Sequence, residues 1–230
     1  MATTAGARIG TLRERPLHAS LKRWYARPGD RIEVALDGFV IDLVRGDLLI
    51  EVQTRGLSSM RHKVATLLGR GQRLRIVFPI AVDTWLVKLD GHDTVLSRRR
   101  SPRHGSPCDA FAELVSIARL LTHPHLEIDL VLVAMEEHRR HTLDGPWRRR
   151  GWTVEERQLI EVLETRSIRG VEDLAALLPP GLPTRFTTAE LAVCLGRSRR
   201  VAQQMAYCLR LVDVIVVVGK RRHAMEYRVA

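Results

Sequence analysis

The spacing of apolar residues along the chain changes at Pro28-Gly29. Before this dipeptide, apolar residues recur near helical spacing and predict a helix over residues 11–27. After it, apolar and polar residues alternate, as in strands that bury one face. The alternation predicts three strands, over residues 31–36, 39–45 and 48–54. Asp37-Gly38 and Gly46-Asp47 separate these strands, and both dipeptides favour two-residue hairpin turns.

The next part of the chain alternates between helical and strand patterns. The expected elements are a helix over 57–70, strands over 74–80 and 85–89, a loop over 97–107, a helix over 109–121 and a strand over 126–135. The loop is basic and contains three consecutive arginines, Arg98, Arg99 and Arg100. This order of elements predicts an α/β domain over residues 1–137, in which helices cover a mixed sheet.

The polar, basic segment over residues 138–152 contains Gly145-Pro146 and is predicted to be a linker to a second domain, over residues 153–230. In that domain, residues 187–190 form a capping box that opens a short helix. Gly196 ends this helix and Ser198 caps the next one. The expected elements are helices over 153–165, 171–178, 189–195 and 199–211, then β segments over 214–218 and 225–229.

A helix, a tight turn and a second helix, followed by two β segments, resemble a winged helix. The resemblance implies an α+β winged helix-turn-helix domain that binds DNA. The contacts are expected at the start of the second helix and at the tip between the β segments. The residues concerned are Arg197, Arg199, Arg200 and Gln203 on the helix, and Lys220, Arg221 and Arg222 at the tip. The alternative is a winged helix that makes protein contacts or dimerises.

The two predicted turns fix the register of the first three strands. Counting outward from them puts Glu33 opposite Asp42 and Asp42 opposite Glu51, on one face of the sheet. Apolar residues share this face, so it is expected to be covered, and the opposed like charges then need compensation. A divalent cation such as Mg²⁺ provides it by taking carboxylate oxygens as ligands. The alternatives are hydrated acids on an exposed face, or ion pairs with Arg61 or Lys63.

Ile41-Asp42-Leu43 followed by Ile50-Glu51-Val52-Gln53-Thr54 resembles the core motif of the PD-(D/E)XK nuclease superfamily. The element order over residues 11–80 agrees with the αβββαβ core of that superfamily. The resemblance implies a restriction-endonuclease-like core in which Asp42 and Glu51 bind Mg²⁺ or Mn²⁺ for the hydrolysis of DNA.

The sequence departs from the superfamily two residues after the glutamate, where Gln53 stands in place of the usual lysine. Gln53 is expected to orient water or phosphate, and Lys63 on the following helix is a candidate for the missing cation. The alternative for Lys63 is a solvated or phosphate-contacting lysine. The register count adds Glu33 as a third metal ligand. Glu14 matches an extra acid that some members carry on the first helix, and the alternative is a surface glutamate.

The formal net charge of +11 favours a polyanion as partner, although a GC-rich genome also enriches arginine. The three cysteines lack metal-ligand spacing and predict buried thiols in a reducing cytoplasm. No apolar run approaches the roughly 20 residues of a membrane span. The expected protein is a Mg²⁺-dependent DNA endonuclease, for which a homodimer would pair two active sites. The alternatives are a non-catalytic DNA-binding regulator with a degenerate nuclease core, or a subunit of a larger defence or repair complex.

Overall fold

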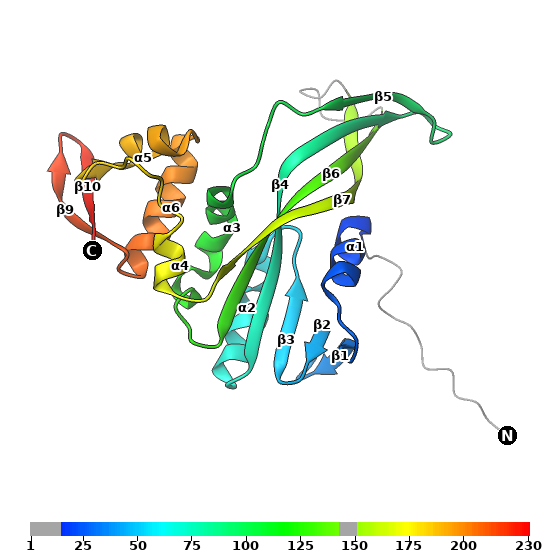
Figure 1. Cartoon of the computed structure of the whole chain (residues 1–230), viewed down its shortest axis with the longest axis horizontal. Coiled ribbons are helices and arrows are strands. Elements are labelled where there is room, and N and C mark those ends of the chain that lie inside the picture. The colour runs from blue at the N-terminus through cyan, green and yellow to red at the C-terminus, as the bar shows by residue number, and fades with distance from the viewer. Residues whose placement is uncertain (1–14, 143–150) are drawn as a thin grey trace.

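A computed structural model describes residues 15–142 and 151–230 of the chain. It contains a mixed sheet of seven strands, covered by helices, and a second sheet of three strands near the C-terminus (Figure 1). The predicted α/β class is therefore confirmed. None of the helices in the described residues is long and apolar enough to cross a membrane.

The first part of the chain follows the predicted order of a helix, three strands, a helix and further strands. Its elements are α1 (Pro16–Tyr25), β1 (Arg31–Leu36), β2 (Phe39–Arg45), β3 (Leu48–Val52), α2 (Leu57–Gly69), β4 (Arg73–Leu89), β5 (Val95–Arg100), α3 (Phe111–Leu114), β6 (Leu126–His141) and β7 (Trp152–Ile168). Short 3-10 turns over Pro107–Ala110 and Val115–Leu120 flank α3, so the predicted helix over 109–121 is broken into three pieces.

The strands of the large sheet lie in the order β1-β2-β3-β4-β6-β7, and β5 pairs with β4. Both predicted hairpin registers are confirmed, with Leu36 opposite Phe39 and Arg45 opposite Leu48. The hairpin turns adopt the expected left-handed backbone, for example at Gly38, where φ is 83°. β4 runs parallel to both β3 and β6, and β7 runs antiparallel to β6.

The predicted helix over 153–165 is wrong, because this segment lies within strand β7. The strand pairs with β6 along its length, from His141 opposite Trp152 to Ile128 opposite Ile168. Residues 153–165 mix β-branched and charged residues, so their local preference is weak and the edge of β6 decides their conformation.

The predicted linker over 138–152 is wrong at both ends for the same reason. Residues 138–141 continue β6, and Trp152 begins β7. Gly145-Pro146 lies outside the described residues, among residues 143–150.

The predicted loop over 97–107 begins as strand β5, which is fully exposed and pairs antiparallel with the second half of β4. The predicted strands over 74–80 and 85–89 are one strand, with an irregularity between Ala81 and Asp83. The three consecutive arginines therefore stand on an edge strand rather than in an irregular loop.

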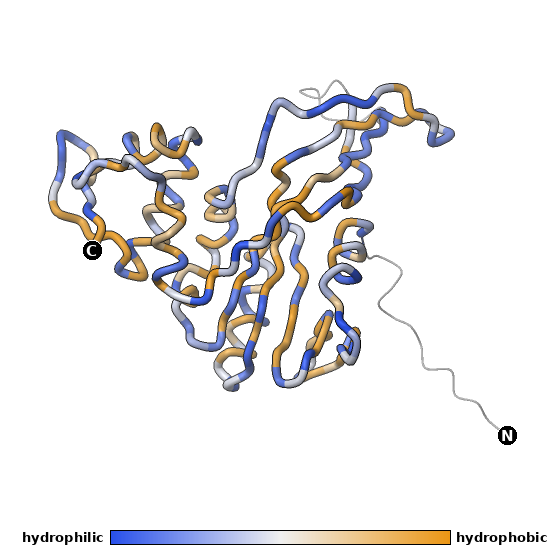
Figure 2. Tube along the Cα trace, viewed as in Figure 1, coloured by the Kyte–Doolittle hydropathy of each residue, from blue (hydrophilic) through white to orange (hydrophobic). Residues whose placement is uncertain are grey.

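The large sheet separates two layers of apolar side chains. On one face, Leu17 and Leu21 of α1 pack with Leu43 and Ile50 of the hairpin strands. On the other face, α2, α3 and the central strands form a larger cluster. Figure 2 shows these apolar positions along the central strands. The burial of both faces agrees with the apolar character of β3 and β6.

The C-terminal part packs against α3 without a gap in the core. Its elements are α4 (Val171–Ala175), β8 (Phe186–Thr187), α5 (Thr188–Leu195), α6 (Arg199–Leu211), β9 (Ile215–Arg221) and β10 (Ala224–Val229). Both predicted helix caps are present, since Thr187 accepts a hydrogen bond from the Glu190 amide and Ser198 accepts one from the Val201 amide.

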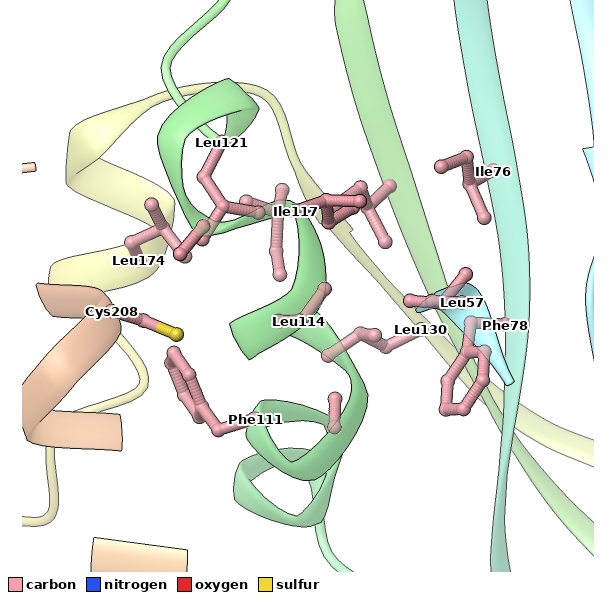
Figure 3. Packing of buried hydrophobic residues seen from close by; sticks show 14 of the residues in the cluster. Leu57, Ile76, Phe78, Phe111, Leu114, Ile117, Leu121, Leu130, Leu174 and Cys208 are labelled. Atoms are coloured by element: carbon pink, nitrogen blue, oxygen red, sulfur yellow. The ribbon is translucent and has the colours of Figure 1, made fainter. Parts of the chain in front are cut away.

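Phe111 of α3 lies at the junction of the two parts. It is fully buried, in the same cluster as Cys208 of α6, Leu174 of α4 and Phe78 of β4. Figure 3 shows α3 between the large sheet and α6. The sheet and the C-terminal helices therefore share one apolar core.

We expect Phe111→Ala to lower the free energy of unfolding by about 3–5 kcal/mol, because it leaves a cavity in this shared core. Urea unfolding followed by tryptophan fluorescence and by far-UV circular dichroism should show both signals shifted together. Val193→Ala is the control, since Val193 is 81% exposed and its loss should change stability by less than about 0.5 kcal/mol. A C-terminal transition that keeps its wild-type midpoint in Phe111→Ala would contradict the shared core.

Candidate active site

A fork between β2 and β3 is the centre of the candidate site. The two strands pair from their hairpin as far as Leu43 opposite Ile50. The next residues along the strands are Asp42 and Glu51, as the register count predicts. β3 continues beside β4 as far as Val52, whereas β2 continues beside β1. The two carboxylates therefore stand where the strands separate.

Where β2 and β3 separate, a side-chain hydrogen bond takes the place of the backbone hydrogen bonds between the two strands. The amide of Val52 donates a hydrogen bond of 2.9 Å to Oδ2 of Asp42. The Asp42 carboxylate thus satisfies a backbone donor that would otherwise be orphaned inside the sheet.

Glu51 is buried, and only 7% of its side chain is exposed. Its Oε1 atom lies 2.6 Å from Nζ of Lys63, which also donates a hydrogen bond of 2.6 Å to the carbonyl of Val40. The contact with Lys63 is an ion pair at hydrogen-bond distance, although its angles do not meet the geometry of a well-directed hydrogen bond to Oε1. Among the buried polar side-chain atoms of the described residues, Oε1 of Glu51 is alone in lacking such a bond.

The two carboxylates of the fork have opposite pKa shifts. Burial raises the pKa of Glu51 to about 7, with Lys63 opposing the rise and the charge of Asp42 adding to it. Burial also acts on Asp42, but hydrogen bonds from His18 and the Val52 amide outweigh it and lower the pKa of Asp42. Near neutral pH the fork thus holds an ionised aspartate beside a glutamate that is partly protonated.

Helix α1 brings a histidine and a lysine to the other side of the fork. Nε2 of His18 lies 3.3 Å from Oδ2 of Asp42, and Nζ of Lys22 lies 2.9 Å from Oε1 of Glu33. The φ angle of 52° at Glu33 breaks the alternation of β1. Glu33 therefore joins α1 and does not complete a ladder with Asp42 and Glu51. No group of three or more His, Cys, Asp or Glu side chains in the described residues is arranged to hold a metal.

Gln53 is turned away from the fork. Its Nε2 atom donates hydrogen bonds to the carbonyls of Arg55 and Gly56, at 2.6 and 3.3 Å. These bonds close the turn that leads into α2, where Gly56 has a φ of 69°. Lys63 is the residue that the fold brings to Glu51, and this ion pair is the contact that the sequence analysis gave as an alternative to a bound cation.

The sequence analysis missed His18 and Lys22. They are four residues apart, on the helix that buries Leu17 and Leu21, and this spacing puts both on one face. The pattern was readable, but nothing in it indicated that α1 crosses the fork. Glu14 lies outside the described residues.

A pocket of about 300 Å³ lies beside the fork, where the start of α1, the end of β3 and β7 meet. Leu17 and Thr54 in its lining are close in sequence to His18 and Gln53. The lining includes three arginines and two glutamates, Arg15, Arg55, Arg157, Glu155 and Glu156. The three guanidinium groups outnumber the two carboxylates, so the lining carries an excess of positive charge.

The predicted DNA contacts fall into two groups in the structure. Four of them are exposed, at the start of α6 or at the β9–β10 turn, namely Arg199, Arg200, Lys220 and Arg222. Gln203 is exposed as well, one helical turn further along α6. Arg197 instead pairs with Asp109 at 3.3 Å, and Arg221 is held between Glu190 and Glu226. Arg221 therefore braces the hairpin and is a poor contact for a phosphate.

A groove of about 390 Å³ between α6 and the β9–β10 hairpin adds residues that the sequence analysis missed. Tyr207, Arg210 and His223 line it together with Arg199 and Gln203. The helical spacing of Gln203, Tyr207 and Arg210 was visible in the sequence, but the position of the hairpin beside them was not.

Asp42 and Glu51 are the residues of the fork that could hold a divalent cation. Carboxylate oxygens are the ligands that hard divalent cations prefer, and Asp42 is kept ionised beside Glu51. In the structure Oε1 of Glu51 faces Nζ of Lys63 at 2.6 Å, so a cation bound to Glu51 would have to share this oxygen with the ammonium group or displace it.

The raised pKa of Glu51 predicts a pH dependence of stability. The raised pKa lets the folded state keep the proton up to about pH 7, whereas the unfolded chain loses it near the ordinary glutamate pKa of 4.5. The free energy of unfolding should therefore fall as pH rises through this window. We expect Glu51→Gln to have a flatter profile between about pH 5 and about pH 8 in urea unfolding.

Glu164→Gln is the matched control for this measurement, because Glu164 is 48% exposed and far from the fork in sequence. It should keep the wild-type slope. An identical slope in Glu51→Gln would mean that Glu51 titrates in its ordinary range.

Comparison with known proteins places the chain in a family. A family model described as a domain of unknown function, DUF8091, matches residues 15–169, from the residue before α1 to the residue after β7. An uncharacterized protein of Treponema pallidum (strain Nichols) is 31% identical over 185 residues, which cover 80% of this chain and 73% of that protein. No solved structure matches the chain significantly. The matched region contains the whole fork, and the chain belongs to the DUF8091 family.

Proposed function

We propose that the protein is a metal-dependent deoxyribonuclease with a PD-(D/E)XK-like core and a C-terminal winged helix that holds DNA. The observation that carries the proposal is the pair of carboxylates, Asp42 and Glu51, at the point where β2 and β3 separate, with Nζ of Lys63 2.6 Å from Oε1 of Glu51. Placing two acids side by side inside the sheet costs stability, so a functional ligand is the best account of them.

The order of elements supports the same proposal. α1, the three antiparallel strands, α2 and the parallel strand β4 give the αβββαβ order that the motif resemblance implies. Asp42 and Glu51 come from neighbouring strands at the point where these strands separate. Lys63 reaches Glu51 from α2 and so takes the place of the lysine that the motif lacks.

The side chains of the fork have distinct roles in the proposed hydrolysis. Asp42 and Glu51 hold Mg²⁺ or Mn²⁺, which when bound neutralises charge on the scissile phosphate. Lys63 stabilises the negative charge that gathers on the phosphoryl oxygens in the transition state. His18 keeps Asp42 ionised and therefore able to bind the cation. The arginines of the neighbouring pocket orient the phosphate backbone.

The C-terminal part supports DNA as the substrate. α5 and α6 form a helix pair with a tight turn at Gly196, and β9 and β10 form a hairpin with a basic tip. The exposed side of α6 carries Arg199, Gln203 and Arg210 along its length. A helix with this face fits the major groove, and the basic hairpin fits the adjoining phosphates.

A second candidate is a non-catalytic DNA-binding protein. It is favoured by the ammonium group of Lys63, which already neutralises Glu51 without a metal. In this case the fork is a structural ion pair, and the DNA surface on α6 carries the function.

Cleavage of plasmid DNA with Mg²⁺ or Mn²⁺ should distinguish the two candidates. If the first holds, Glu51→Gln should abolish cleavage, and Lys63→Met should lower its rate by about 10²–10³-fold through the loss of a preorganised cation. Arg61→Met is the matched control, because Arg61 is exposed on the same helix and should keep the wild-type rate. Wild-type protein that cleaves neither duplex nor single-stranded DNA would favour the second candidate.

Metal binding should also be detectable without any reaction. At a concentration of 100 times the Kd, a cation stabilises the folded state by about 2.7 kcal/mol, which is several degrees in Tm for a chain of this length. We expect thermal melts of the wild type to show this rise with Mn²⁺, and melts of Asp42→Asn and Glu51→Gln to lose it. An equal rise in all three proteins would place the cation elsewhere.

A further inference from the structure

A groove of about 850 Å³ separates the extended half of the large sheet from the start of α6. One wall consists of β4, β6 and β7, and the other consists of the segment that follows β5, together with Arg197, Ser198 and Val201. The groove therefore lies between the sheet that carries the fork and the helix that carries the proposed DNA contacts. These elements can be followed in Figure 1.

Arginine dominates the charge of this groove. Its lining contains four arginines, Arg103, Arg139, Arg157 and Arg197, and two carboxylates, Asp109 and Glu137. Arg139 and Arg157 share Glu137, at 2.6 and 3.0 Å, so one carboxylate faces two guanidinium groups. Arg103 makes no ion pair with any described residue. The groove therefore has an excess of positive charge that its own acids do not neutralise.

The backbone holds Arg103 in place. The amides of Ser101 and Gly105 donate hydrogen bonds to the carbonyls of Thr84 and Ala81, at 2.7 and 2.9 Å. A Cβ atom at Gly105 would lie 2.3 Å from the Ala81 carbonyl oxygen, so this close approach requires glycine. The segment is fastened to β4 at both ends, which positions Arg103 at the groove before any ligand arrives.

The positive surface continues onto β5. Arg99 stands opposite Leu86 in the antiparallel pair, and so shares a face with this groove-lining residue. Arg99 is exposed and, like Arg103, makes no ion pair within the described part of the chain. Two unpaired arginines thus stand at the rim and in the lining of one groove.

We propose that this groove binds the phosphodiester backbone of a single-stranded segment of nucleic acid. The inference rests on the proposed function, to which it adds the form of the substrate. Arginine forks match phosphate oxygens with two parallel hydrogen bonds, and unpaired guanidinium groups are free to make them. A groove of this volume holds a ligand the size of a drug molecule, which corresponds to a few nucleotides of one strand.

The test is the binding of a labelled oligothymidylate and of a labelled duplex of equal length, at several salt concentrations and without divalent cations. The variant is Arg99→Gln with Arg103→Gln in the full chain, since neither change breaks an ion pair. The matched control is Arg61→Gln with Arg119→Gln, which also removes two exposed arginines that make no ion pair within the described residues.

We expect the Arg99→Gln/Arg103→Gln protein to bind the single strand about 3- to 30-fold more weakly than the wild type. The slope of log affinity against log salt should fall by about 1.4, because each lost phosphate contact removes about 0.7 for a single strand. Duplex affinity and the control protein should stay within a factor of about two. Rescue of single-strand affinity by Arg99→Lys with Arg103→Lys would support a charge contact.

Equal single-strand affinity in the variant and the control would overturn the proposal. An equal loss for single strand and duplex would also overturn it, because the groove would then serve duplex DNA. If the wild type binds the single strand through these arginines but cleaves no DNA, the proposed nuclease activity is refuted and single-strand binding in the groove is not. The converse result is that the wild type cleaves DNA with Mn²⁺ while the variant binds the single strand as tightly as the wild type does. That result would refute single-strand binding in the groove and would leave the proposed nuclease activity intact.

Discussion

The contact between Lys63 and Glu51 is the interaction on which the arrangement of the candidate site depends. A carboxylate buried between two strands and a helix is costly unless a cation and hydrogen bonds compensate it. The ammonium group of Lys63, 2.6 Å from Oε1 of Glu51, provides this compensation. The contact ties α2 to the fork, and Gln53 closes the turn that sets where α2 begins. Removing either partner would leave a charge buried and unpaired, so the fork, the turn and the helix depend on one another.

Helices from opposite faces of the sheet meet at this fork and make its two carboxylates unequal. α1 supplies His18 and keeps Asp42 ionised, whereas burial near α2 keeps Glu51 partly protonated at neutral pH. Divergent pKa values in neighbouring acids are a common sign of a functional site. The position of α1 is itself fixed from a distance, because the hydroxyl of Tyr25 bonds to Asp129, which Ser167 also contacts at 2.6 Å. The chemistry of the fork therefore relies on β6 and β7, whose residues contribute nothing to it directly.

The large sheet and the C-terminal helices form one body through α3. Phe111 is buried between the central strands and α6, and Arg197 pairs with Asp109 at the same junction. A continuous core fixes the distance between the fork and the basic face of α6. If the protein is the proposed nuclease, a nucleic acid held by α6 meets the sheet in a set orientation, and the arginine groove between the two is part of its path.

The sequence by itself determined the local features whose signals are contained in a few adjacent residues. Asp37-Gly38 and Gly46-Asp47 specify two hairpins and their registers, which is why Asp42 and Glu51 could be placed side by side. The capping residues Thr187 and Ser198 likewise specify where α5 and α6 begin.

Tertiary structure decided what depends on partners distant in sequence. Residues 152–168 became a strand because β6 offers them a paired edge, although their own pattern also suits a helix. Glu33 does not lie with Asp42 and Glu51 as predicted, because it pairs with Lys22 of α1. Lys63 contacts Glu51 because α2 packs over the fork. Backbone turns are short-range and are encoded locally, whereas pairing of strands and compensation of buried charge are long-range and are fixed only when the whole core assembles.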